Sequence, residues 1–263
     1  MAQIAKKPAR VVAPQVARLV PPLELCRVIG AGSAQEYLAG GRMTFRLLRQ
    51  HGGLLPAHRV LDVGCGCGRV AVPLVEYLTT GSYDGFDVIG RLIDWARDHI
   101  TPFHTNFRFR HVDLHNDFYN PAGTAQAADF SFPYEAGSFD AVLLNSVFTH
   151  MLYDESVRYL REIQRVLRPG GTAVMSFFLL NEESDALRAL PESKLRFRHR
   201  YHKGLRIENR ETPSGAVAFP EATVRALLRE NGLALQELLF GNWCARGVGP
   251  HFQDYVIARR RAA

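Results

Sequence analysis

Residues 60–69, Val-Leu-Asp-Val-Gly-Cys-Gly-Cys-Gly-Arg, decide the fold. An apolar run with one acid passes into alternating glycines, and a helix is predicted from Arg69 to Leu78. This order is typical of the strand, turn and helix start of a nucleotide-binding βαβ unit. The tight turn needs backbone angles that a Cβ disfavours, and the ligand must approach the main chain. We therefore predict a site for an adenosine-containing ligand, which a side chain at Gly64 or Gly66 would block.

Length and composition indicate one globular domain with small appendages. The chain has 263 residues, of which 47% are hydrophobic and 22% are charged, enough for a sizeable core. The net charge of +6 lies partly at the two ends, where solvated tails explain it better than nucleic-acid binding. Residues 1–22 are rich in proline and poor in acids, so we expect a flexible arm there.

Cysteine use and hydropathy bear on location. Of the four cysteines, Cys65 and Cys67 lie within the glycine turn, where a disulfide would distort it. No second Cys/His pair follows at zinc-site spacing, so no metal is predicted. No apolar run approaches the roughly 20 residues that span a bilayer. We expect a protein of the reducing cytoplasm without a membrane span.

From residue 58 onward, strand and helix patterns alternate. Strands are predicted at 59–63, 83–88, 107–112, 141–145, 171–178, 234–240 and 254–259. Helices are predicted at 69–78, 89–100, 154–167 and 221–231. The fold class is therefore α/β, a Rossmann-like three-layer sandwich with a mainly parallel sheet of seven strands. No helix separates the last two strands, so they should form a hairpin with the final strand antiparallel.

Three segments lie outside this alternation. Residues 23–56 carry two short helical patterns and are expected to form a helical cap ahead of a domain at 57–263. Insertions at about 114–138 and 181–219 are too long for plain connections. Placed beyond the carboxyl ends of the strands, they would form an acceptor pocket.

An acid at the end of the second strand strengthens the ligand prediction. Asp87 lies 19 residues beyond Gly68, where a carboxylate can accept both hydroxyls of a bound ribose. Arg69 occupies the place of the third glycine in the dinucleotide fingerprint G-x-G-x-x-G. A binding site for the pyrophosphate of a dinucleotide is therefore less favoured.

Four motifs together resemble the class I S-adenosylmethionine-dependent methyltransferases. They are residues 60–69, 84–88 (Asp-Gly-Phe-Asp-Val), 132–142 (Phe-Pro-Tyr-Glu-Ala-Gly-Ser-Phe-Asp-Ala-Val) and 160–171 (Leu-Arg-Glu-Ile-Gln-Arg-Val-Leu-Arg-Pro-Gly-Gly). They follow the order of that family over about residues 58–180. The resemblance implies a seven-stranded sheet with an antiparallel last strand and S-adenosylmethionine as the cofactor.

The resemblance also implies roles for individual residues. The glycines would pass beneath the methionine and ribose parts of the cofactor, Asp62 would hold its ammonium group, and Asp87 would take the ribose hydroxyls. Asp113 resembles the acid that accepts from the adenine amino group, with Asp129 as the alternative. The implied cofactor site comprises Asp62, Gly64, Cys65, Gly66, Gly68, Asp87, Val88, Asp113, Leu114, Asn145 and Ser146.

One histidine is the candidate catalytic residue. Methyl transfer from a sulfonium depends mainly on alignment and exclusion of water, but a hydroxyl acceptor also needs a general base. His150 follows the fourth strand, where cofactor and acceptor should meet, and the reference pKa of histidine is near neutral. A packing or capping role for His150 is the alternative.

The sequence thus favours a methyltransferase acting on a small molecule, with a hydroxyl of a saccharide or secondary metabolite as the expected acceptor. RNA or protein methylation is an alternative with the same chemistry. An NAD-linked oxidoreductase is an alternative from another class, and a non-catalytic binding module is the last one. The oligomeric state does not follow from the sequence.

Overall fold

A mainly parallel sheet of seven strands forms the centre of the molecule. The structure is a computed structural model and describes residues 18–247, 249 and 251–262. The strands are β1 (Arg59–Val63), β2 (Ser82–Asp87), β3 (Phe107–His111), β4 (Phe139–Leu144), β5 (Leu167–Phe177), β10 (Leu233–Leu239) and β11 (Asp254–Arg260). Their order is β10-β11-β5-β4-β1-β2-β3. The predicted fold class is confirmed.

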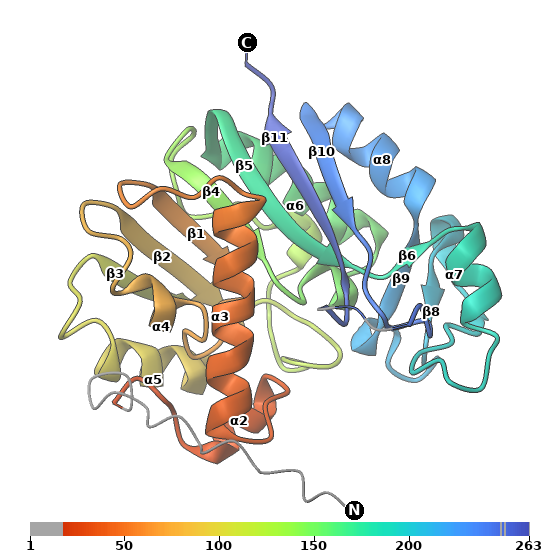
Figure 1. The fold of residues 1–263 in the computed structure, drawn as a ribbon, viewed down its shortest axis with the longest axis horizontal. Coiled ribbons are helices and arrows are strands. Elements are labelled where there is room, and N and C mark those ends of the chain that lie inside the picture. The colour runs from red at the N-terminus through yellow and green to blue at the C-terminus, as the bar shows by residue number, and fades with distance from the viewer. Residues whose placement is uncertain (1–17, 248, 250, 263) are drawn as a thin grey trace, which may run out of the picture.

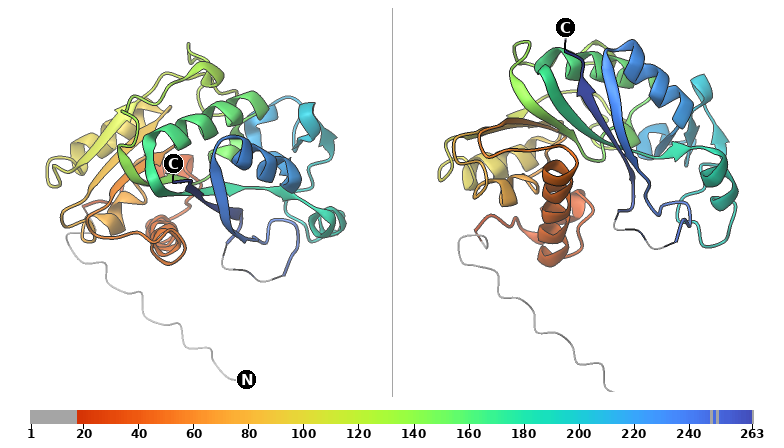
Figure 2. Two further views of the ribbon diagram at one scale, coloured as in Figure 1. Left: turned by 90° about the horizontal axis from the view of Figure 1, so that it is seen from above. Right: turned by 45° about the horizontal axis from the view of Figure 1, so that its top comes forward.

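Helices cover both faces of this sheet and complete three layers (Figures 1 and 2). One face packs against α3 (Ala34–Gln50), α4 (Ala71–Leu74) and α5 (Gly90–His99), with α2 (Leu23–Val28) beside them. The other face packs against α6 (Tyr153–Val166) and α8 (Glu221–Glu230). Helix α4 is shorter than the predicted helix 69–78, and it contains Pro73, which cannot donate a backbone hydrogen bond.

The two hydrophobic cores meet at the central strands. Val60 of β1 packs into the core under α3, whereas its neighbour Leu61 packs into the core under α6. Successive side chains of a strand point to opposite faces, so a strand covered on both sides is apolar throughout. Both residues are fully buried. This burial fixes the register of β1 and thereby the place where the glycine turn begins.

The last two strands form the predicted hairpin. Strand β11 is antiparallel to β10 on one side and to β5 on the other. It therefore lies between two strands that run in the common direction. The usual dinucleotide-binding sheet has no such antiparallel strand, so this topology counts against an NAD-linked oxidoreductase.

The first insertion forms a compact loop after β3. Two isolated bridges hold it, Leu114 with Ala125 and Asn116 with Asn120, and the short 3-10 helix η1 (Ala127–Asp129) follows. The helix η2 (Phe148–His150) lies between β4 and α6. The loop packs near η2, because the Asn116 amide donates to the carbonyl of His150 at 3.0 Å.

The second insertion contains regular structure that the sequence pattern did not predict. It forms a small sheet of β6 (Leu179–Leu180), β7 (His199–Arg200), β8 (Arg206–Ile207) and β9 (Val217–Pro220), with α7 (Glu182–Leu187), η3 (His202–Gly204) and η4 (Pro213–Gly215). We call residues 178–220, 241–247, 249 and 251–253 the lobe. The lobe has its own apolar cluster around Phe178, Phe197 and Trp243. Strands of two residues are too short to give a periodic signal.

The ends of the chain bear on the predicted domain limits. Residues 1–17 of the predicted arm lie outside the described residues, and Leu19 is buried in the core under α3. Helices α2 and α3 occupy the predicted cap, whose boundary with the domain at 57–263 stays a prediction. Within the described residues, no helix has the length and hydropathy needed to cross a membrane.

Candidate functional site

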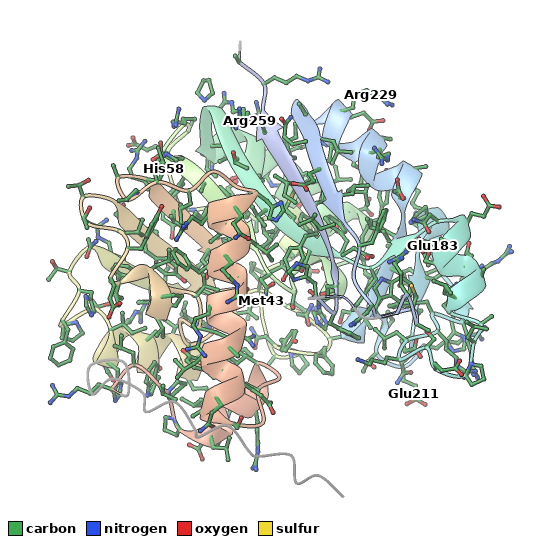
Figure 3. The ribbon with its side chains drawn as sticks, in the orientation of Figure 1. Met43, His58, Glu183, Glu211, Arg229 and Arg259 are labelled. Carbon is green, nitrogen blue, oxygen red and sulfur yellow. The ribbon has the colours of Figure 1, made fainter. Side chains whose placement is uncertain are left out.

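A cavity of about 270 Å³ opens at the carboxyl ends of β1, β2 and β4. This edge lies opposite the one marked by His58, Arg229 and Arg259 in Figure 3. Apolar walls include Ile29, Leu92, Met151 and Tyr159, and polar groups come from several separate segments. The predicted site residues on its wall are Gly64, Asp87, Val88, Leu114, Asn145, Ser146 and His150.

The glycine turn has the backbone that the sequence predicts. Gly64, Gly66 and Gly68 all have positive φ, at 72°, 56° and 80°, a region that residues with a Cβ rarely adopt. A Cβ on Gly64 would lie 2.6 Å from Cγ2 of Val147. Tyr37 of α3 supports the turn by donating its buried hydroxyl to the Cys67 carbonyl at 3.2 Å. The bare main chain is therefore held against the cavity.

Asp87 is fixed at the junction of the turn and β2. Its carboxylate accepts from the backbone amides of Gly66 at 2.8 Å and Ile89 at 2.9 Å. Burial raises the pKa of Asp87, and these hydrogen bonds act against that rise. Each carboxylate oxygen can accept a second hydrogen bond. The site thus offers two acceptors to a ribose.

Asp62 and Cys65 line a second cavity of about 30 Å³ beside the first. The Tyr83 hydroxyl donates to the Asp62 carboxylate at 2.6 Å, and burial raises the pKa of Asp62 to about 7. Cys65 and Cys67 are buried free thiols. No group of metal-binding side chains was found among the described residues. Gly68 lines neither cavity.

Asn145 and Ser146 are held by the strands on the other side of β4. Tyr255 of β11 donates its hydroxyl to the Asn145 side-chain oxygen at 2.5 Å. Ser146 has φ 63°, and its backbone amide donates to the Ser176 hydroxyl at 2.6 Å. A left-handed non-glycine residue costs of order 1–3 kcal/mol and is concentrated at functional sites. Ser146 therefore holds a strained backbone conformation on the cavity wall.

Asp113 has a different environment from the one that the resemblance implies. Its carboxylate is exposed and accepts from Thr124 at 2.7 Å and from Asn120 at 3.3 Å, both within the first insertion. These hydrogen bonds lower its pKa. Asp113 does not line the cavity, and neither does Asp129. The Leu114 amide donates to Val112. A role for Asp113 or Asp129 toward adenine stays a prediction.

His150 is placed between the two insertions. Its Nδ1 lies 3.0 Å from the carbonyl oxygen of Ser214, and its Nε2 lies 3.4 Å from the Tyr119 hydroxyl. A carbonyl can only accept, so Nδ1 carries the proton and neutral Nε2 is an acceptor, with the Tyr119 hydroxyl as its neighbour. Burial lowers the pKa of His150, so the neutral base is the dominant form at pH 7.

The structure adds residues to the cavity that the sequence did not single out. Arg69 lines both cavities and donates to the Ile29 carbonyl at 2.9 Å, which ties the cap to the glycine turn. Asn116 lines the wall and accepts from the amides of Phe118 and Tyr119. Glu155 and Tyr159 reach it from α6. Their spacing of four residues on one helix face was the only signal in the sequence.

Comparison with known proteins agrees with this geometry. Residues 61–175 match a family described as a methyltransferase domain. The match covers the glycine turn, Asp87 and the strands up to β5. Together with the sheet order, this match over residues 61–175 supports the class that the resemblance implied, the class I S-adenosylmethionine-dependent methyltransferases. S-adenosylmethionine is the cofactor of this class.

One curated relative and two solved structures show how far the similarity extends. Methyltransferase GfsG of Streptomyces halstedii is 33% identical over 133 residues, which are 51% of this chain and 42% of that protein. A 1,6-didemethyltoxoflavin-N1-methyltransferase of Burkholderia thailandensis, solved with that compound and S-adenosylhomocysteine, has a TM-score of 0.56 at 18% identity, covering 98% of this chain and 94% of that one. The cyclase SpnF has a TM-score of 0.59 at 21% identity, covering 95% and 96%.

These similarities have limits. The chain spans about half or less of the length of the curated relatives it matches. The structural likenesses, at 18% and 21% identity, show the fold alone. One fold supports different chemistries, so the acceptor must be argued from the site of this chain.

Proposed function

We propose that this protein transfers the methyl group of S-adenosylmethionine to a hydroxyl of a small molecule, such as a saccharide or a secondary metabolite. The observation that carries the proposal is His150, which lines the cavity with Nδ1 donating to the Ser214 carbonyl and Nε2 left as an acceptor near the Tyr119 hydroxyl. A hydroxyl is a poor nucleophile until its proton leaves. A half-buried neutral imidazole in η2, shortly after β4, supplies the base that this acceptor requires.

The residues of the cavity fit the cofactor. The bare turn at Gly64 and Gly66 leaves space that a Cβ would fill, and Asp87 offers acceptors for the ribose hydroxyls. Asp62 lies in the adjoining small cavity, where it would hold the ammonium group. When bound, S-adenosylmethionine supplies a methyl group on positively charged sulfur.

The residues of the protein align the acceptor with the methyl group, exclude water and supply a base. Asn145 and Ser146, held by Tyr255 and Ser176, would fix the direction of approach beside the transferable methyl. Phe118 and Tyr119 pack on the imidazole, with Phe118 stacked at 5.8 Å, and keep water from it. His150 takes the acceptor proton on Nε2, while Ser214 holds the proton on Nδ1.

Other partners are less well supported. The basic segment 194–210 lies in the lobe, and the cationic residues of 1–17 lie outside the described residues. The described residues therefore give no support to RNA or protein methylation through a basic stripe joining these two segments. A cytoplasmic location stays part of the proposal and is supported by the four free cysteines.

Calorimetry with S-adenosylhomocysteine beside NAD tests the cofactor assignment. We expect the first ligand to bind and NAD to give no heat of binding. Asp87→Ala should weaken S-adenosylhomocysteine binding with the fold retained, because the ribose loses its acceptors. Binding of NAD alone would show that the assignment is wrong.

Turnover on a panel of polyhydroxylated acceptors tests the base. His150→Ala should lower kcat by about 10²–10⁴-fold, the usual contribution of a general base, with little change in S-adenosylhomocysteine affinity. His202→Ala is the matched control, because His202 is exposed on the lobe. Full activity of the His150 variant on its true acceptor would make this residue structural only.

A further inference from the structure

The adenine amino group needs an acceptor that Asp113 does not supply in this structure. This reasoning rests on the proposed function, because it assumes that the cavity holds S-adenosylmethionine. The Asp113 carboxylate accepts from Thr124 and Asn120 and lies off the cavity wall. An amino group buried without an acceptor loses a hydrogen bond that it made in water, which is costly.

The direction of the bound base follows from the position of the ribose. Ribose is the middle of the cofactor, so its base and its amino-acid part leave it in opposite directions. The glycine turn, Arg69 and Asp62 lie on one side of Asp87 and take the amino-acid part. The base must extend toward the β3 side, where Leu114, Ala127 and Tyr159 form an apolar wall.

A carboxylate lines the cavity wall together with these residues. Asp87 and Glu155 are the two carboxylates that line the cavity, within the described ranges. Glu155 belongs to the first turn of α6, on the same helix face as Tyr159. Its oxygen Oε2 accepts from the Leu152 amide at 2.7 Å. For the other oxygen, Oε1, the described residues provide no hydrogen-bond donor.

The other side-chain acceptors on this part of the cavity wall already accept hydrogen bonds or are not carboxylates. The Asn116 side-chain oxygen accepts from Phe118 and Tyr119, and His150 faces Tyr119. Burial raises the pKa of Glu155, and neighbouring His115 acts against that rise. An amino group donating to Oε1 would stabilise the carboxylate form.

We propose that Glu155 is the acceptor for the adenine amino group, and that it selects a 6-amino over a 6-oxo purine in the cofactor. The first turn of α6 thus has two functions. One oxygen of Glu155 accepts from the Leu152 amide at the start of the helix, and the other accepts from the adenine amino group. Asp113 instead stabilises the first insertion.

The 6-oxo analogue S-inosylhomocysteine, compared with S-adenosylhomocysteine by calorimetry, tests the proposal. The wild-type protein should prefer S-adenosylhomocysteine by about tenfold or more, since a hydrogen bond to a charged group is worth at least that factor. In Glu155→Gln, the side-chain oxygen can still cap Leu152, because glutamine serves at this helix position as well as glutamate. The amide NH₂ then faces the base and matches a 6-oxo group, so the preference should vanish or reverse.

A second variant distinguishes the loss of the adenine hydrogen bond from a local change in α6. Glu155→Ala removes both functions and should bring the two ligands to near equal affinity without a reversal. Thermal melting of each variant shows that the fold is retained. A wild-type preference that both variants leave unchanged would overturn the proposal.

Asp113→Asn is the matched control, because it makes the same chemical change off the cavity wall. It should leave the ratio of the two affinities as in the wild type. If Asp113→Asn shifts the ratio and Glu155→Gln does not, Asp113 is the adenine acceptor and the proposal is wrong. It is also wrong if Glu155→Gln only raises the KM of the methyl acceptor. Failure of the wild type to bind either ligand would instead refute the proposed function itself.

Discussion

Asp62 is a buried carboxylate in the small cavity beside the glycine turn. Within the part of the chain that the structure describes, its side chain accepts from the Tyr83 hydroxyl and makes no ion pair. Burial raises its pKa to about 7, with Asp87 acting in the same direction. An ordinary carboxyl titrates near 4. The ligand-free protein therefore holds the Asp62 proton more tightly than the unfolded chain does.

This pKa predicts pH-dependent cofactor binding. A ligand ammonium group prefers ionised Asp62, so the affinity for S-adenosylhomocysteine should rise as the pH rises through about 7. The stability of the ligand-free protein should depend on pH in the opposite direction. Its free energy of unfolding should fall as the pH rises from about 4 to about 7. Calorimetry between pH 5.5 and 8.5, about 1.5 units on either side of this pKa, measures the first effect.

The control for this prediction is Asp62→Asn. The amide does not titrate, so the rise in affinity across neutral pH should disappear while the fold remains. An unchanged pH dependence in the variant would assign the effect to another group, such as His150 or Asp87.

The glycine turn is the element on which the proposed cofactor binding depends. Its three positive φ angles are possible because no Cβ is present, and the Asp87 carboxylate accepts from the Gly66 amide. Strand β1 holds the start of the turn in register, and Tyr37 of α3 holds its underside. Local sequence, strand register and a distant helix all stabilise the same conformation.

Gly64→Ala should abolish measurable cofactor binding. A left-handed alanine costs about 1–2 kcal/mol, and its Cβ would also meet Val147 at 2.6 Å beside the cavity. Gly53→Ala is the matched control, with φ 65° and nothing within 4 Å of the added Cβ. The control should lose about the same 1–2 kcal/mol of stability and keep its affinity for S-adenosylhomocysteine. Equal affinity of both variants would contradict the role of the turn.

On the scale of the whole molecule, the lobe contributes to the candidate site from outside the matched residues 61–175. Ser214 of the lobe orients His150, and Gln253 accepts from the Ser146 hydroxyl at 3.1 Å. Asp254 joins the lobe to the main sheet: its buried carboxylate accepts from the Leu179 and Gly241 amides, the Trp243 indole and Arg246. The proposed base, His150, is therefore held by residues far from it in sequence.

Asp254→Asn should destabilise the protein by about 3–5 kcal/mol, because a donor replaces one acceptor and Arg246 loses its buried partner. For a chain of this size that corresponds to a fall in Tm of roughly 10 °C. Differential scanning calorimetry measures the change. Asp185→Asn, which breaks a half-exposed pair with Arg188, should cost at most about 1 kcal/mol. Equal melting temperatures would show that Asp254 does not hold the lobe.

The sequence determined the parts of this protein that follow from local covalent order. Strand β1 has the predicted bounds, and the turn, Asp87 and Asn145 lie at strand ends because each follows its strand directly in the chain. Parallel strands bring such ends to one edge of the sheet. For this reason the fold and the class could be predicted without coordinates, whereas the place of the cofactor stays a prediction.

Only the tertiary structure decided what depends on contacts between distant segments. The small sheet of the lobe has strands too short for a periodic pattern, and Ser214 fixes the tautomer of His150 across 64 residues. The direction of Asp113 depends on Thr124 and Asn120 in the insertion, and the place of Glu155 depends on how α6 packs against the sheet. A residue type and its spacing do not specify which way a side chain points when its partners come from loops. Packing and hydrogen bonding across the fold settle that direction.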